Sequence, residues 1–238
     1  MNDNFANKVI VVTGAAGALG SAVSAFFHSQ GAKVANLDYS LDVFKQNGIS
    51  AIDSEQQLFI ALDLTERQAC AQAAQTIIQR WSRIDCLINI AGGFIMGEAV
   101  HETSDKTWDF LFNLNTRSVL NTAAAFVPTM IAQQSGKIVN ISAGAAHHGI
   151  ATMGTYVASK CAVLRLTESM ALELRDNQIN VNCILPGTID TARNRSDMPN
   201  ADFNRWVAPS QIASVIGFLC SDAANAVHGA GIPVTGLS

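Results

Sequence analysis

The stretch Lys8-Val-Ile-Val-Val-Thr13-Gly14-Ala-Ala-Gly17-Ala18-Leu19-Gly20 decides the fold of this chain. A β-branched apolar run leads directly into a glycine-rich turn, and helical periodicity follows at once. Small residues in the turn, Gly14, Gly17 and Ala18, let the backbone approach a pyrophosphate, and Gly20 lets the helix pack against the strand. The helix amino terminus, which includes Leu19, offers N–H groups and partial positive charge to phosphates. Taken alone, the stretch fits an ordinary tight turn equally well.

Apolar runs and helical segments alternate along the chain. After Lys8–Thr13, the predicted strands are Lys33–Leu37, Leu58–Leu62, Cys86–Ile90, Lys137–Ile141, Ile179–Leu185 and Ile232–Val234. The predicted helices are Leu19–Gln30, Glu66–Trp81, Trp108–Gln134, Tyr156–Arg175 and Pro209–Cys220. Strands that are apolar along their whole length predict a parallel sheet covered on both faces. We therefore expect one α/β domain over residues 1–238: a Rossmann-type doubly wound parallel sheet of about seven strands, with helices on both faces.

Composition excludes several functional classes. The chain has 238 residues, 49% hydrophobic and 14% charged, with a net charge of -4 and no basic run, which argues against a nucleic-acid or membrane partner. Its five cysteines are scattered and lack a C-x-x-C pair, and its histidines lack ligand spacing, so we expect neither disulfides nor a bound metal. No signal-like amino terminus and no membrane-spanning apolar run is seen, so we expect a cytoplasmic protein.

Acidic residues end the second and third predicted strands. Asp38 lies about 20 residues beyond the glycine turn, where a carboxylate accepts hydrogen bonds from the adenine ribose hydroxyls. It would repel a 2′-phosphate, and neither Ala15, Ala16 nor Tyr39 supplies a compensating cation, so the sequence predicts NAD (NADH) rather than NADP. The alternative is a loop acid or helix cap.

The third and fourth strand ends carry further cofactor candidates. Asp63, followed by Leu64, fits two roles equally: a contact to the adenine amino group, or an amino-terminal cap for a helix over Thr65–Trp81. Asn89-Ile-Ala91-Gly92-Gly93 closes the fourth strand. Its small residues admit a cofactor, and Asn89 is expected to tie strand ends together.

The segment Tyr156-Val-Ala-Ser-Lys160 places a phenol and an ammonium four residues apart, on one face of a helix. Two unit charges about 4 Å apart interact by roughly 4 kcal/mol at an effective dielectric near 20. Lys160 is therefore expected to pull the pKa of Tyr156 down from about 10 toward neutrality, which makes Tyr156 a candidate general acid and base. Viewed alone, the pair also fits an ordinary helix-surface contact.

In order and spacing these motifs resemble the short-chain dehydrogenase/reductase family over nearly the whole chain. The residues that carry the resemblance are the glycine turn, Asp63, Asn89–Gly92, Asn115, Ser142, Tyr156, Lys160 and Pro186-Gly187. One departure is Ala18, where the family usually has its middle glycine. The resemblance implies a catalytic tetrad: Ser142 holds and polarises the substrate carbonyl, and Tyr156 transfers the proton. Lys160 tunes Tyr156 and binds the nicotinamide ribose, and Asn115 holds a water next to Lys160.

A polar segment follows the sixth strand. The resemblance places Pro186, Gly187, Ile189 and Thr191 beside the nicotinamide carboxamide, and residues 188–208 are predicted to form a substrate flap. Residues 190–206 look like the corresponding stretch of dihydropteridine reductases. Those reductases generally lack the catalytic serine and the helix asparagine, which favours a carbonyl or alcohol substrate here.

The expected substrate lining consists of Gly93, Phe94, Ala143, His148, Met198 and Trp206. For His148 the alternative is a solvated loop residue, and for the last two it is packing against the final helix. The helices Trp108–Gln134 and Tyr156–Arg175 are apolar nearly all round. With the family resemblance, this indicates a homodimer or homotetramer, and the alternative is burial within one subunit.

The sequence therefore predicts an NAD(P)-dependent oxidoreductase that interconverts a small-molecule carbonyl and an alcohol. Two alternatives remain within enzymes: a 3-oxoacyl-thioester (acyl-carrier-protein) reductase, with Arg193, Arg195 and Arg205 as candidate cations, and a dihydropteridine reductase-like activity. A nucleotide-binding regulator without catalysis is disfavoured because all four tetrad residues are present. A non-redox epimerase would need a larger substrate lobe.

Overall fold

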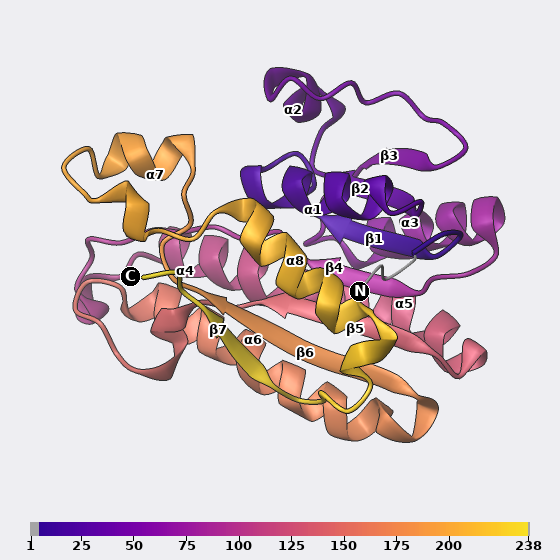
Figure 1. Cartoon of the computed structure of the whole chain (residues 1–238). Coiled ribbons are helices and arrows are strands. Elements are labelled where there is room, and N and C mark those ends of the chain that lie inside the picture. Colours follow the sequence, from indigo (N-terminus) through magenta and orange to yellow (C-terminus); the bar gives the residue numbers. More distant parts are fainter. Residues whose placement is uncertain (1–4, 238) are drawn as a thin grey trace.

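A computed structural model describes residues 5–237, and within them the chain forms one parallel sheet of seven strands (Figure 1). The strand order is β3-β2-β1-β4-β5-β6-β7, and every neighbouring pair is parallel. The bounds are β1 Val9–Thr13, β2 Lys33–Asp38, β3 Gln57–Ala61, β4 Cys86–Asn89, β5 Gly136–Ile141, β6 Ile179–Pro186 and β7 Gly231–Val234. The predicted Rossmann-type α/β sheet is confirmed.

Helices cover both faces of this sheet, as Figure 1 shows. One layer contains α1 (Ala18–Ser29) and α8 (Pro209–Cys220), which pack against each other. The opposite layer contains α3 (Arg67–Trp81), α5 (Ser118–Gln133) and α6 (Gly154–Leu174). The order of the strands reverses between β1 and β4, so the carboxyl ends of these strands border the crevice where such sheets bind ligands.

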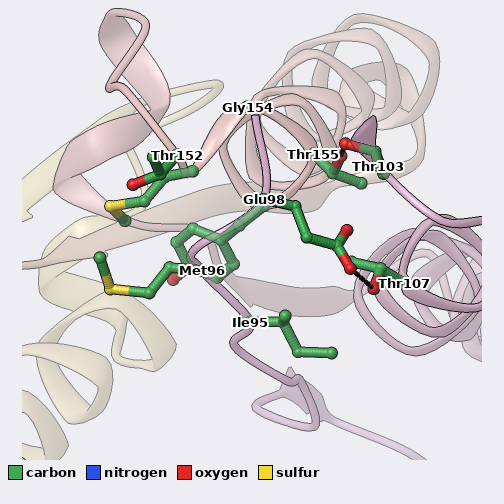
Figure 2. A pocket seen from close by; sticks show the side chains of 10 residues that line it. Ile95, Met96, Glu98, Thr103, Thr107, Thr152, Gly154 and Thr155 are labelled. Atoms are coloured by element: carbon green, nitrogen blue, oxygen red, sulfur yellow. Dashed lines mark hydrogen bonds between the residues drawn. The ribbon is translucent and has the colours of Figure 1, made fainter. Parts of the chain in front are cut away.

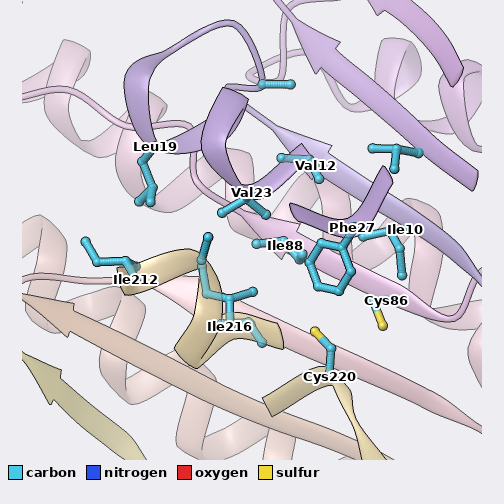
Figure 3. Packing of buried hydrophobic residues seen from close by; sticks show 14 of the residues in the cluster. Ile10, Val12, Leu19, Val23, Phe27, Cys86, Ile88, Ile212, Ile216 and Cys220 are labelled. Carbon is cyan, nitrogen blue, oxygen red and sulfur yellow. The ribbon is translucent and has the colours of Figure 1, made fainter. Parts of the chain in front are cut away.

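Alternate residues of β1 explain why it is apolar throughout. Ile10 and Val12 face α1 and α8, where they pack with Val23, Phe27 and Ile216 (Figure 3). All five side chains are fully buried. Successive strand residues point to opposite faces. Because helices cover both faces of the sheet, both sets of β1 residues are buried and apolar.

The second face of β1 repeats this packing. Val9 and Val11 belong to a separate cluster with Ile77 of α3 and Phe126 of α5. The core is thus two apolar layers separated by the sheet, and together they fix the carboxyl ends of the strands relative to the helices.

The glycine turn joins β1 to α1 by close backbone contacts. Gly14 has a φ of 64°, and a Cβ on it would lie 3.0 Å from the backbone nitrogen of Ala91. A Cβ on Gly20 would overlap the carbonyl oxygen of Gly14. Only glycine fits at these two positions, because the first needs a left-handed backbone and the second has no room for a side chain.

The segment predicted as one helix, Trp108–Gln134, is interrupted in the structure. It comprises α4 (Asp105–Phe112), a π-helical turn over Asn113–Arg117, and then α5. The start of α4 is fixed by Ser104, whose Oγ accepts a hydrogen bond from the backbone N–H of Thr107. Hydrophobic periodicity did not reveal the π turn because the pattern continues through it.

Several short elements complete the fold. The helix α2 (Leu41–Gln46) was not predicted, and α7 (Ala192–Asp197) lies in the segment predicted as a flap. Single 3-10 turns span Val100–Glu102, Gly144–His147, Arg175–Asn177, Phe203–Arg205 and Asp222–Ala224. No helix formed by residues 5–237 combines the length and the apolar character needed to cross a membrane.

Candidate active site

A chain of buried hydrogen bonds connects the helices and strands around the crevice. Asn89 of β4 and Asn140 of β5 are partners in strand register, and the Nδ2 of Asn89 donates to the Oδ1 of Asn140 at 2.8 Å. Thr122 of α5 donates to Asn89 at 2.9 Å, and Asn140 donates to Thr167 of α6 at 2.9 Å. All four side chains are buried. The hydrogen bonds of Asn89 thus tie β4 to β5 and α5, as the sequence predicted for the strand ends.

Asn115 lies in the π turn and faces the end of β4. Its Oδ1 accepts the backbone N–H of Gly93 at 2.7 Å, and its Nδ2 donates to the Oγ of Ser159 at 2.9 Å. Ser159 in turn donates to the carbonyl of Tyr156 at 2.7 Å. Asn115 therefore links the segment after β4 to the helix that carries Tyr156. Ser159 was not predicted, because nothing in its local sequence marks this contact.

Lys160 is buried at the end of β5. Its Nζ donates to the carbonyl of Ile141 at 3.0 Å, and its side chain is 5% exposed. A Cβ placed on Gly92 would lie 3.1 Å from this Nζ and 2.9 Å from the Oδ1 of Asn115. The ammonium, the amide and Gly92 thus meet at one point.

Ser142, the predicted contact of the substrate carbonyl, lies at the end of β5 and hydrogen-bonds to α6. Its Oγ donates to the carbonyl of Lys160 at 2.7 Å, and the residue is 3% exposed. Its backbone N–H donates to Ile184 of β6 at 2.9 Å. A serine hydroxyl has one proton, and here that proton goes to the backbone of α6 rather than to the crevice.

Tyr156 lies one helical turn before Lys160 on α6 and contacts the segment after β4. Its ring meets Phe94 edge to face, with ring centroids 4.8 Å apart. The structure therefore brings Phe94, predicted as a substrate contact, to the candidate catalytic phenol.

Burial controls the pKa values of both α6 groups. It raises the pKa of Tyr156 from 10.0 to about 12, and it lowers the pKa of Lys160 from 10.5 to about 8. The sequence predicted that Lys160 would lower the pKa of Tyr156, and this prediction is wrong for the structure described here. The physical reason is desolvation, which disfavours the charged form of each group, while the Lys160 ammonium is directed to Ile141.

Asp38 anchors the glycine turn at the end of β2. Its Oδ2 accepts the backbone N–H of Ala16 at 2.9 Å, and its Oδ1 accepts the backbone N–H of Tyr39 at 2.8 Å. Asn47, which was not predicted, donates to the carbonyl of Ala16 at 3.0 Å. The predicted ribose carboxylate is thus held against the predicted pyrophosphate turn.

A dinucleotide fits this edge of the sheet. The helix α1 begins at Ala18 after Gly17, which provides no side-chain cap, so its first-turn N–H groups face the turn without a side-chain acceptor. The absence of Cβ atoms at Gly14 and Gly20 keeps the turn narrow. These features match what a pyrophosphate requires, although Ala18 replaces a glycine.

Asp63 lies in a local turn rather than at a helix cap. Its Oδ1 accepts the N–H of Thr65 at 2.8 Å, and the N-cap residue of α3 is Glu66. Of the two roles considered for Asp63, the helix cap is therefore wrong, and the contact to the adenine amino group stays a prediction. Leu64 is buried, and its carbonyl accepts a hydrogen bond from Asn121 at 3.0 Å.

The segment after β6 is closed at its base. Pro186 ends the strand, Gly187 donates to Val234 at 3.2 Å, and Ile189 forms an isolated bridge with Val207. Thr191, predicted as a nicotinamide contact, caps α7 by accepting the N–H of Asn194 at 3.1 Å. The bridge separates residues 190–206 from the sheet as a distinct loop.

The other predicted substrate residues differ in their surroundings. Trp206 is half-buried and packs on Phe203 inside the flap, with ring centroids 4.8 Å apart. Met198 and His148 are exposed, whereas Ala143 is buried directly after Ser142.

A pocket beside Tyr156 contains residues that were not predicted. Its lining includes Ile95, Met96, Glu98, Thr152 and Gly154 (Figure 2). The Oε1 of Glu98 accepts the hydroxyl of Thr107 at 3.0 Å, and its Oε2 accepts the N–H of Ser104 at 3.2 Å. Glu98 thereby pins the segment after β4 to the start of α4. The pattern Ser104-x-x-Thr107 signals the helix start but not its carboxylate partner.

Comparisons with known proteins agree with this geometry. The model of the family described as short chain dehydrogenase matches residues 8–202. The chain belongs to the short-chain dehydrogenase family, and it is an oxidoreductase of the kind that acts on CH–OH or C=O groups.

Relatives and solved structures resemble the chain over nearly its full length. It is 31% identical to the 3-oxoacyl-(acyl-carrier-protein) reductase FabG of Thermotoga maritima, covering 96% of each chain. It is also 31% identical to the NAD-dependent glycerol dehydrogenase of Listeria innocua, covering 98% of this chain and 94% of that one. The crystal structure of levodione reductase superposes with a TM-score of 0.89 at 25% identity, covering 98% of this chain and 97% of that one.

Burial of the Lys160 ammonium should make the free energy of unfolding depend on pH. The unfolded chain keeps this proton up to about pH 10.5 and the folded chain only to about 8, so folding below pH 8 costs roughly 3 kcal/mol, at about 1.4 kcal/mol per pKa unit. The cost disappears as the pH rises from 8 to 10.5. Lys160→Met removes the charge but also a hydrogen bond to Ile141, so it should raise the free energy of unfolding at pH 7 by about 1–3 kcal/mol, with a smaller gain at pH 10.

Denaturant unfolding at both pH values measures this effect. Lys106→Met, at an exposed position of α4, serves as the control and should change stability by less than about 0.5 kcal/mol. A Lys160→Met protein that is less stable than wild type at pH 7 would contradict the prediction.

Proposed function

We propose that the protein is an NAD(H)-dependent oxidoreductase that interconverts a carbonyl and an alcohol, with Tyr156 as general acid and base. The observation that carries the proposal is the meeting of Tyr156, Lys160 and Asn115 beside the carboxyl ends of β4 and β5. A bound nicotinamide would supply or accept the hydride. We propose that the whole chain acts as one such unit.

At neutral pH Tyr156 is in the form that donates a proton, which is the form that carbonyl reduction needs. With a pKa of about 12, Tyr156 is a phenol at pH 7 and can donate a proton to a substrate oxygen. Lys160, with a pKa of about 8, is mostly an ammonium at pH 7. Its Nζ donates to Ile141, so it would have to turn toward Tyr156 to stabilise negative charge on the phenol oxygen. Phe94 packs on the Tyr156 ring and limits its orientations. We assign substrate proton transfer to Tyr156 and charge stabilisation to Lys160.

Replacing Tyr156 tests this assignment. Tyr156→Phe keeps the ring that packs on Phe94 but removes the proton, so kcat should fall by about 10²–10⁴ without a loss of folding. Turnover is measured on a panel of ketones, acyl thioesters and quinonoid pterins with NADH and NADPH. Tyr39→Phe, at a side chain 72% exposed, is the control and should leave turnover unchanged. Near-wild-type turnover by Tyr156→Phe would overturn the proposal.

The preference for NAD rests on Asp38. Its carboxylate is held against the glycine turn by the N–H groups of Ala16 and Tyr39. A 2′-phosphate at this position would meet a fixed negative charge. The NAD-dependent relative named above supports this part of the proposal.

Cofactor preference should depend on this charge. We expect kcat/KM for NADH to exceed that for NADPH at least about tenfold, and Asp38→Asn to lower the ratio by about the same factor, since 1.4 kcal/mol corresponds to a factor of ten. Asp42→Asn, at an exposed position of α2, is the control and should keep the wild-type ratio. Faster turnover with NADPH by the wild-type protein would refute the role of Asp38.

A thioester reductase remains a second candidate only through similarity to the FabG relative. The three arginines predicted to meet an acyl carrier already contact groups of this chain. Arg195 pairs with Asp190 at 2.6 Å, Arg193 lies 3.6 Å from Asp197, and Arg205 donates to Leu237 at 2.5 Å. Each arginine would have to leave its present partner to meet an acyl carrier, at a small cost because the ion pairs are exposed.

The proposed unit is a homodimer or homotetramer in the cytoplasm. Large apolar side chains remain exposed on α4 and α5, among them Trp108, Phe110 and Leu120. Burial of such side chains stabilises association. Leu120→Glu should shift sedimentation toward the monomer, and Ile52→Glu, at an exposed loop position, should not. A wild-type protein that sediments as a monomer would contradict this part of the proposal.

A further inference from the structure

A small pocket lies between the segment after β4 and the start of α6, and Tyr156 forms part of its wall (Figure 2). Its volume is about 10 Å³, which is the space that one water-sized group needs. Glu98 is the only charged residue among the ten that line it. A ligand group that enters this pocket is therefore small, and it lies next to both a carboxylate and the proposed proton donor.

The carboxylate of Glu98 keeps acceptor capacity for a ligand. Its Oε1 accepts the hydroxyl of Thr107 at 3.0 Å, and its Oε2 accepts the backbone N–H of Ser104 at 3.2 Å. The hydroxyl of Ser104 lies 3.4 Å from the same Oε1. A carboxylate accepts about four hydrogen bonds. At least one acceptor position therefore remains for a donor in the pocket that Glu98 lines.

The opposite wall of the pocket is the start of α6. Gly97 donates to the carbonyl of Thr152 at 2.8 Å, which holds the segment with Glu98 against the turn before this helix. The first N–H groups of a helix have no partner within it, and α6 has no side-chain cap. Among residues 5–237, no group accepts a hydrogen bond from the backbone N–H groups of residues 154–156, which line the pocket.

The remaining polar groups of the pocket are the hydroxyls of Thr103, Thr107, Thr152 and Thr155. A hydroxyl both donates and accepts, and it rotates to suit its partner, so these four groups do not select between ligands. The two walls do select, because a carboxylate only accepts and a backbone N–H only donates. A ligand group that satisfies both walls has to donate one hydrogen bond and accept another. A hydroxyl does so, whereas an ammonium cannot accept and a carboxylate cannot donate.

We propose that this pocket binds a hydroxyl group of the substrate, that Glu98 is the residue that determines this specificity, and that the preferred substrates are short α-hydroxy ketones. This rests on the proposed carbonyl reduction. In that reaction the C=O π bond breaks, a hydride from NADH forms the new C–H bond, and the Tyr156 proton forms the O–H bond. NADH loses two electrons, and the carbonyl gains them. The substrate hydroxyl keeps its own proton and holds the adjacent carbonyl beside Tyr156.

The first test compares 1-hydroxypropan-2-one with butan-2-one, which has a methyl group in place of the hydroxyl, using NADH at pH 7. The wild-type protein should favour the hydroxy ketone at least about tenfold in kcat/KM, since a hydrogen bond to a charged group contributes about this factor or more. 1-Methoxypropan-2-one also carries an electron-withdrawing oxygen but has no proton to donate, so it should not share this preference. An equal preference for the methoxy ketone would overturn the role of Glu98.

Two charged analogues test the assignment of a hydroxyl. 1-Aminopropan-2-one carries an ammonium beside the ketone, and pyruvate carries a carboxylate there. The wild-type kcat/KM for each should be at least about tenfold lower than for 1-hydroxypropan-2-one, because each leaves one wall of the pocket unsatisfied. A higher value for either charged analogue would overturn the hydroxyl assignment.

Variants separate substrate binding from support of α4. Glu98→Gln keeps the size of the side chain and an oxygen for Thr107, and it should lower the kcat/KM ratio of 1-hydroxypropan-2-one to butan-2-one about tenfold. Ser104→Ala removes the hydroxyl that caps α4 next to Glu98 but changes no residue of the pocket lining, so it should lower stability and keep the wild-type ratio. Glu102→Gln, at an exposed carboxylate of the same segment, should change neither.

The outcomes distinguish failure of this inference from failure of the proposed function. A Glu98→Gln protein with the wild-type ratio, or an equal loss of the ratio in Ser104→Ala, would make Glu98 a support of α4 alone and overturn the inference. Equal use of 1-hydroxypropan-2-one and butan-2-one by the wild-type protein would also overturn it, while the proposed carbonyl reduction would stand. Reduction of none of these compounds overturns the inference, and the wider panel used for Tyr156→Phe then decides the proposed function separately.

Discussion

The arrangement of the candidate site depends on the hydrogen bond between Asn89 and Asn140. These residues are register partners on β4 and β5, so their amides meet only if the two strands pair without a slip. Thr122 extends the chain into α5, which follows the π turn with Asn115, and Thr167 extends it into α6, which carries Tyr156 and Lys160. Buried polar groups are costly when left unpaired. An arrangement that broke this chain would take the buried amides of Asn89 and Asn140 away from their partners, whereas Thr122 and Thr167 would keep hydrogen bonds to carbonyls of their own helices.

Exclusion of water from this interior also determines the pKa values of Tyr156 and Lys160. Lys160 loses hydration and gains one carbonyl, and Tyr156 loses hydration and gains an aromatic neighbour. Desolvation therefore raises the pKa of Tyr156 and lowers the pKa of Lys160. Both values differ from those expected for an exposed pair on a helix surface. The estimate of roughly 4 kcal/mol of attraction assumed that the ammonium faces the phenol oxygen. In the structure the ammonium faces the end of β5 instead.

Sequence patterns predicted the parts of the molecule that rest on local rules. The glycine turn, the alternation of strands and helices, and the polar residues at the strand ends follow from periodicity and small side chains. The contacts of Asn115, Phe94 and Asp38 are with Gly93, Tyr156 and Ala16, and their roles toward cofactor and substrate stay predictions. The π turn at Asn113–Arg117, the carboxylate of Glu98 and the contact of Ser142 were not predictable in this way. Asn115 of the π turn and Ser142 contact residues that are distant in the sequence, and the rotamer of Ser142 decides where its hydroxyl donates. The partners of Glu98 are closer, but no periodic pattern marks a carboxylate that reaches a helix start.

The bridge between Ile189 and Val207 closes the base of the flap, and Arg205 inside the flap is also hydrogen-bonded to Leu237. Its two ends are joined by hydrogen bonds of Val207 to Thr188 at 3.1 Å and of Asp190 to Val207 at 2.8 Å, so the distance between them does not depend on the residues in between. The entropy of closing a loop grows only slowly with its length. Segments of other lengths and compositions can therefore be exchanged between these anchor points while β6 and α8 stay in place. A change within residues 190–206 therefore need not move the strand ends or α6, where the candidate catalytic groups lie.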